Sequence, residues 1–168
     1  MEFHINTSPS PESYYNNGRQ FCEAAWRSFG GRDGKVAENG IILCLPVPTV
    51  VNAAFSCEMH FKALLLLERK AFPKGKEGHN LKSLFSRLEV ETQERIGAFC
   101  LPKSLPSPLE AFIAILESHK QDFADTRYYM EHSGWQEMSP ITMLTISENL
   151  TTITGVLIKE NNEVLEGK

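Results

Sequence analysis

The sequence predicts an all-α protein with one hydrophobic core, and three observations support this prediction. Apolar residues recur at intervals of three and four along several long stretches, which is the period of an amphipathic helix. Ser-Pro pairs at residues 10–11, 107–108 and 139–140 are typical of capped helix starts. A chain of 168 residues, 42% of them hydrophobic, is sufficient for one substantial core. We therefore expect a single domain over residues 1–168.

The first helix is expected over residues 11–29. Ser10 provides the N-cap, and Gly30-Gly31 provides the stop. Residues 30–48 contain four of the chain's eleven glycines. We interpret them as a loop inserted after the leading helix.

The second helix is expected over residues 48–70. Its apolar stripe consists of Val50, Ala54, Cys57, Phe61, Leu64 and Leu65. A loop rich in lysine and glycine follows over residues 71–78. A third, shorter helix is expected over residues 80–88, with a continuation over 93–99 before a connector rich in proline.

The fourth helix is expected over residues 107–132, because a Ser-Pro-Leu-Glu start is followed by no glycine or proline. The fifth helix is expected over residues 139–159. Its apolar positions are Ile146, Leu150, Ile153 and Leu157. Residues 161–168 are polar and are expected to fray.

Charge and cysteine usage limit the classes of function. The net charge of -4 argues against a generally basic nucleic-acid-binding surface, although a local cationic groove remains possible. No pair of cysteines has C-x-x-C spacing, so we expect free thiols in a reducing compartment at Cys22, Cys44, Cys57 and Cys100. The first residues have no signal-peptide pattern, and no membrane-spanning run is expected. These features favour a soluble, cytoplasmic protein.

Two charges of opposite sign are predicted to face inward. On helical wheels, Glu58 lies about 60° from the centre of its apolar stripe, and Arg127 about 40° from the centre of the stripe on the fourth helix. An unpaired buried charge costs several kcal/mol, so Glu58 is the expected partner of Arg127. Lys62 is expected at the boundary of the core, as the i,i+4 partner of Glu58.

Three blocks of the sequence resemble the HEPN family of small helical domains. They are Glu58-x-x-x-Lys62-Ala-Leu-Leu, His79-x-Leu-x-x-Leu-Phe and Arg127-Tyr-x-x-Glu131. The resemblance covers roughly residues 50–160. It implies an antiparallel up-and-down bundle of four to five long helices, assembled as a homodimer.

Arg127 and His132 are separated by four residues, which satisfies the R-x(4–6)-H motif of the catalytic HEPN members. The resemblance implies metal-independent RNA cleavage, with Arg127 stabilising phosphate charge and His132 acting as general acid or base. Two features oppose this interpretation. Tyr128 follows the arginine where catalytic members commonly have a polar residue. An ideal helix also places the two side chains about 140° apart, so they would converge only if the helix end unwound or a second subunit contributed.

His79 has two interpretations. It is a capping or packing residue at the start of the third helix, or it belongs with Lys74 and Lys76 to a cationic loop. No group of His, Cys, Asp and Glu has the spacing of metal ligands, so neither a metal nor another cofactor is expected.

Two functions are therefore considered. The first is a non-catalytic HEPN-like module for interaction or for nucleotide or RNA binding, acting with a nucleotidyltransferase or in a defence or toxin-antitoxin system. Its binding or structural charge network would comprise Glu58, Lys62, His79 and Glu131. The second is a metal-independent ribonuclease that uses Arg127 and His132.

Overall fold

The computed structural model describes residues 9–31, 45–102, 104–118 and 139–167. Over these ranges the fold contains six α-helices, one short 3-10 helix and no strand. The prediction of an all-α protein is confirmed.

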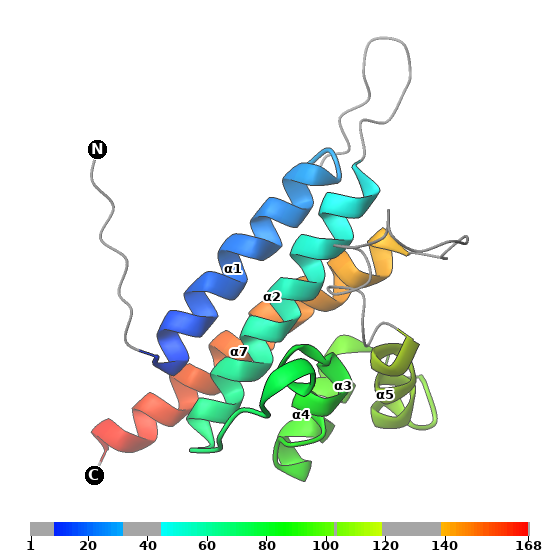
Figure 1. Ribbon diagram of the computed structural model, residues 1–168. Helices are drawn as coiled ribbons and strands as arrows, with labels where there is room; N and C mark the ends of the chain where they lie inside the picture. Colours follow the sequence, from blue (N-terminus) through cyan, green and yellow to red (C-terminus); the bar gives the residue numbers. More distant parts are fainter. Residues whose placement is uncertain (1–8, 32–44, 103, 119–138, 168) are drawn as a thin grey trace, which may run out of the picture.

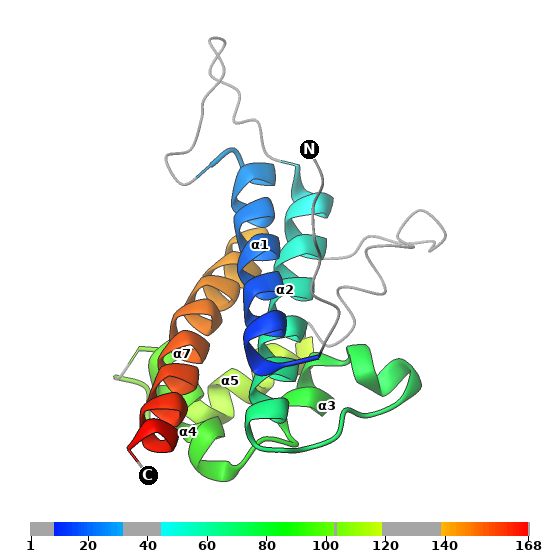
Figure 2. The same ribbon diagram turned by 90° about the vertical axis from the view of Figure 1, so that its left-hand side faces the viewer.

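The three longest helices are α1 (Pro11–Ser28), α2 (Pro46–Leu67) and α7 (Pro140–Glu166). Figures 1 and 2 show α1 antiparallel to both of the others, and α2 packs against both α1 and α7. The packing is that of a helical bundle. In the described residues only these three helices are long, whereas four to five were expected.

The shorter helices gather beside the C-terminal half of α2 (Figure 1). They are the 3-10 helix η1 (Gly75–His79), α3 (Leu81–Phe85), α4 (Val90–Cys100) and α5 (Pro108–Ser118). The predicted third helix and its continuation correspond to α3 and α4, which a turn at residues 86–89 separates. The predicted fourth helix is described only as far as Ser118.

Helix α1 begins and ends as its sequence predicts. Ser10 and Ser13 form a reciprocal capping box, in which each side chain accepts a hydrogen bond from the other's backbone N–H. At the other end, Gly30 and Gly31 adopt positive φ angles of 103° and 87°. Only glycine adopts such angles at little cost, so this pair terminates the helix.

Helix α2 ends at Leu67, three residues earlier than expected, in a Schellman motif. The N–H of Lys70 donates to the carbonyl of Leu65, and the N–H of Arg69 donates to the carbonyl of Leu66. Arg69 has a φ of 58°, a left-handed conformation that usually belongs to glycine at this position. An arginine there costs the fold about 1 kcal/mol relative to glycine.

Helix α7 continues to Glu166, so the fraying expected for residues 161–168 is wrong for the part of this tail that is described. The apolar positions Ile146, Leu150, Ile153 and Leu157 are buried, as predicted. No glycine or proline interrupts the chain between Gly155 and Gly167, and an ion pair joins Lys159 to Glu163 one turn later. The backbone hydrogen bonds therefore propagate past the last buried residue.

The core is continuous from the long helices to the short ones. Phe61 of α2 packs on Phe85 of α3 with ring centroids 5.6 Å apart, and Phe85 packs on Phe112 of α5 at 5.1 Å. All three side chains are fully buried. Aromatic pairs in these tilted arrangements add to the free energy gained by burial, so this series ties the two groups of helices together.

Two helices, α2 and α7, are long and apolar enough by composition to cross a membrane. In the bundle, however, 67% of the apolar window of α2 and 50% of that of α7 are buried against other helices. The core helices of a soluble bundle have the same composition, so this feature does not favour a membrane location.

Candidate functional site

The candidate site is the charge network of Glu58, Lys62 and His79, which we call the Glu58 network. Glu58 lies in the middle of α2 and is fully buried. Lys62 follows one turn later, and its Nζ lies 2.6 Å from Oε1 of Glu58. The side chain of Lys62 is 13% exposed, so this ion pair lies at the edge of the core, as the sequence predicts.

His79 reaches the same carboxylate from the end of η1. Its Nδ1 lies 3.1 Å from both carboxylate oxygens of Glu58, so the ring nitrogen donates to the carboxylate. The His79 side chain is 52% exposed, whereas that of Glu58 is 1% exposed. A buried acid thus fixes the orientation of a half-exposed imidazole.

The capping role considered for His79 belongs to Asn80 instead. The side chain of Asn80 accepts a hydrogen bond from the N–H of Ser83 at 2.9 Å and so caps α3. His79 is therefore one residue outside the cap, and its ring turns to α2.

The segment between α2 and α3 is held in place by local contacts. Phe72 packs edge-on against Tyr14 of α1, and the Nζ of Lys62 lies 5.7 Å from the centroid of the Phe72 ring. A Cβ on Gly78 would lie 2.7 Å from the carbonyl oxygen of Pro73, so only glycine fits there. These contacts fold the segment back along α2 and bring His79 to Glu58.

The arrangement suits anion recognition better than acid–base chemistry by Glu58. Its carboxylate accepts hydrogen bonds from both Lys62 and His79 and is enclosed by protein. The two donors compensate its buried charge, and of the two His79 is the more exposed to solvent. Among the residues that the structure describes, no group of three His, Cys, Asp or Glu side chains could hold a metal ion.

A second buried polar group, which the sequence analysis did not identify, lies two residues after Glu58 in α2. His60 is fully buried, and its Nε2 lies 2.8 Å from Oγ1 of Thr151 on α7. Because that hydroxyl already donates to the carbonyl of Ser147, we assign the Nε2 proton to His60 as the donor. Burial lowers the pKa of His60 to about 3, so the ring is neutral at pH 7.

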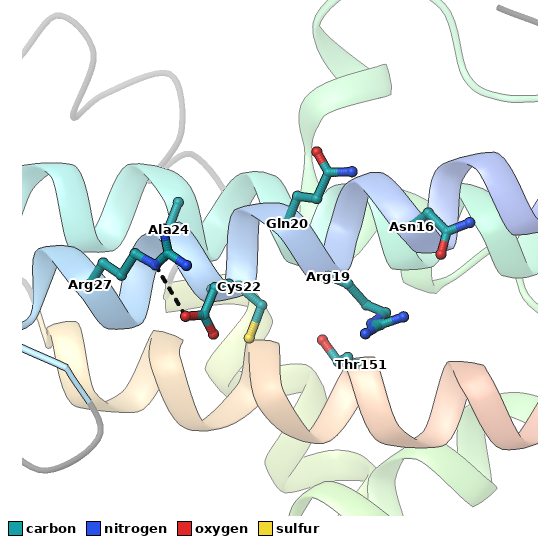
Figure 3. Close-up of a pocket in the computed structure, with 8 residues that line it drawn as sticks. Asn16, Arg19, Gln20, Cys22, Ala24, Arg27 and Thr151 are labelled. Atoms are coloured by element: carbon teal, nitrogen blue, oxygen red, sulfur yellow. Dashed lines mark hydrogen bonds and ion pairs between the residues drawn. The ribbon is translucent and has the colours of Figure 1, made fainter. Parts of the chain in front are cut away.

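A surface cavity of about 730 Å³ lies between α1 and α7, and Figure 3 shows the side chains that line it. Arg27 pairs there with Glu23 at 3.1 Å, and the guanidinium of Arg19 lies 5.8 Å from the ring of Tyr15. The side chains of Arg27 and Glu23 are 78% and 45% exposed. Because no buried group holds these charges, the cavity is a weaker candidate than the Glu58 network. The feature of the sequence that could have identified this cavity is the set of polar residues at spacings of three and four along α1.

The remaining predicted site residues are Arg127, Glu131 and His132, and they lie outside the described residues. The expected ion pair between Glu58 and Arg127 and the ribonuclease motif therefore both remain predictions.

Comparison with models of known protein families, with curated proteins and with solved structures found no match to this chain.

Proposed function

We propose that this chain is a non-catalytic HEPN-like module that binds nucleotide or RNA phosphate groups through the surface of the Glu58 network. The observation that carries the proposal is the enclosure of Glu58 beneath two hydrogen-bond donors, the Lys62 ammonium and the His79 imidazole. Lys62 and His79 are the groups that would contact an anion. Glu58 would position them and would not itself react.

The physical basis is the asymmetry of burial within the network. A carboxylate that is 1% exposed and held by two donors cannot readily approach a substrate. His79 is half exposed, and its Nδ1 is already engaged by Glu58. When the ring carries a proton on both nitrogens, the outer Nε2–H can donate to phosphate, as the ammonium group of Lys62 can.

The resemblance to HEPN domains supports the wider setting of the proposal. In that setting the chain is a cytoplasmic homodimer that acts with a nucleotidyltransferase or within a defence or toxin-antitoxin system. The antiparallel up-and-down arrangement of the complete bundle belongs to the same proposal.

The second candidate is a metal-independent ribonuclease that uses Arg127 and His132. One specific observation favours it, namely the spacing of these residues, which satisfies the R-x(4–6)-H motif. Tyr128 is the departure that makes it the second choice.

RNA binding and RNA cleavage distinguish the two candidates. We expect fluorescence anisotropy with a labelled single-stranded RNA of about 15 nucleotides to show binding that His79→Gln weakens about fivefold, which is the loss of one charge-assisted contact. The melting temperature of this variant should change little, because the glutamine side chain keeps an N–H donor for Glu58 and the ring it replaces is half exposed. Absence of binding to RNA and to ATP by the wild type would refute the proposal.

Cleavage is measured on the same RNA without added metal. We expect the wild type to leave the RNA intact. Cleavage that is lost in both Arg127→Ala and His132→Ala, at unchanged melting temperature, would establish the ribonuclease in place of the binding module.

A further inference from the structure

Positive charge is concentrated in one short part of this acidic chain. Residues 62–87 contain seven of the 17 Lys and Arg residues and only two of the 21 Asp and Glu residues. The segment therefore has a formal charge of +5, and the rest of the chain has -9. The rest of the chain repels polyanions, so a polyanionic ligand is expected to bind only at this local cationic surface.

The fold arranges this segment along one side of α2. The Nζ of Lys70 donates to the carbonyl of Arg87 at 2.8 Å, which joins the residues just after α2 to the turn after α3. Between Lys70 and Arg87 in the sequence, His79 lies against Glu58. Nine residues of α2 separate Glu58 from Leu67, a rise of about 14 Å. Figure 2 shows the intervening segment looping out at the side of the bundle.

Several cations of the segment already have carboxylate partners. Lys62 pairs with Glu58, Lys70 with Glu68 and Glu89, and Lys82 with Glu117. Four others are exposed and have no ion pair within the described residues. We call these four the cationic strip: Arg69, Lys74, Lys76 and Arg87.

The position of Arg69 adds an independent indication. It occupies a left-handed position, with a φ of 58°, where glycine would be more stable. The fold thus carries a cation at the end of α2 at some cost to its stability. A role for the arginine side chain outside the fold would account for this choice.

We infer that the cationic strip binds the phosphodiester backbone of a single-stranded nucleic acid. This inference rests on the proposed function and extends it from the Glu58 network along α2. Both η1 and α3 have five residues, so neither is long enough to enter a major groove and read base edges. Isolated lysines and arginines on irregular backbone instead suit contacts to successive phosphates, which are tolerant of sequence.

The test is the salt dependence of binding, measured by anisotropy with labelled oligo(U) RNA and oligo(dT) DNA of about 15 nucleotides between about 50 and about 300 mM KCl. Four phosphate contacts predict a slope of log K against log salt concentration of about -3. The double variant Lys74→Gln/Lys76→Gln should weaken the slope by about 1.4 and reduce affinity at least tenfold at low salt. Equal effects on RNA and DNA would identify the backbone as the ligand, whereas effects on RNA alone would assign the strip to the ribose.

The matched control is the double variant Arg27→Gln/Lys159→Gln. It removes the same charge from two side chains that are each 78% exposed and lie outside the strip. Loss of affinity equal to that of the strip variant would overturn the inference, because net charge alone would then explain binding. Equally strong competition by poly-glutamate would also overturn it and would point to an acidic protein partner.

Arg69→Gly tests whether the arginine contributes to binding independently of its effect on the stability of the fold. The substitution should raise the melting temperature by about 2–4 °C and at the same time reduce affinity for oligo(U) severalfold. A higher melting temperature with unchanged affinity would remove Arg69 from the strip.

The strip and the proposed function can fail separately. If His79→Gln weakens RNA binding but the strip variant does not, the strip is wrong and the proposed function stands. If the wild type binds neither RNA nor ATP, the proposed function is refuted, and the strip inference that rests on it is refuted as well.

Discussion

The contact between Gly18 and His60 predicts that a normally stabilising substitution will destabilise this protein. Gly18→Ala in a helix interior should gain about 0.5–1 kcal/mol from helix propensity. Here, however, a Cβ would lie 2.6 Å from Cε1 and 2.7 Å from Nε2 of His60. Both residues are buried, so the ring must move.

The expected loss can be assembled from two contributions. Overpacking of a well-packed core costs about 1–3 kcal/mol. Displacing the ring also breaks the hydrogen bond between His60 and Thr151 and leaves a buried polar atom unsatisfied, at about 1–3 kcal/mol. After subtraction of the propensity gain, we expect a net loss of about 3 kcal/mol, or about 10 °C in melting temperature.

A double-mutant cycle measured by urea unfolding tests this reasoning. In a His60→Ala background the crowding disappears, so Gly18→Ala should be neutral or stabilising there, with a coupling free energy of at least about 2 kcal/mol. Gly97→Ala is the control. Its Cβ would crowd the backbone of Leu109 at 2.9 Å, so its cost should be the same in either background. A Gly18→Ala variant that is more stable than the wild type would refute the packing argument.

Three further predictions concern buried ionisable groups. Glu58→Ala should destabilise the fold by about 2–4 kcal/mol in urea unfolding, because it leaves Lys62 at the edge of the core without its carboxylate. Glu58→Gln should cost less. Equal costs for the two variants would show that the charge of Glu58 is unimportant for stability. His60, whose folded pKa is about 3 against about 6.5 when unfolded, contributes stability that is complete above pH 6.5 and is lost as the pH falls towards 3. The wild type should therefore lose about 3 kcal/mol more than His60→Gln between pH 7 and pH 4, and parallel pH profiles would contradict this. Burial raises the pKa of the Cys100 thiol to about 12, so this thiol should react with Ellman's reagent at pH 8 only after unfolding, as mass analysis of the labelled peptides would show.

The parts of the fold that local sequence determines could be predicted. The cap at Ser10 and the glycine stop of α1 depend only on neighbouring residues, and the apolar period of α7 reports its buried face directly. The pairing of Lys62 with Glu58 is also local, since one helical turn separates them. These features follow from backbone geometry, and tertiary contacts do not override them.

The contact of His79 with Glu58 could not be predicted from spacing. It depends on the return of the chain along α2, which Phe72 fixes by packing on Tyr14. Similarly, the apolar stripe of α2 suggested one buried face. Residues 56–61 are in fact buried on every side, because α2 contacts α1, α3 and α7. The feature of the sequence that indicates this is the placement of small or apolar residues around most of the circumference of α2, interrupted by Glu58 and His60.

The tether of the segment between α2 and α3 has a consequence for binding affinity. Leu65 precedes the segment and Leu81 follows it, and both are fully buried, so the two ends of the segment are fixed in the core. A ligand that binds along it would not have to order the backbone first. The entropy lost on binding would come mainly from the long lysine and arginine side chains. The backbone of this surface is therefore preorganised, whereas its charged side chains can adapt to the ligand.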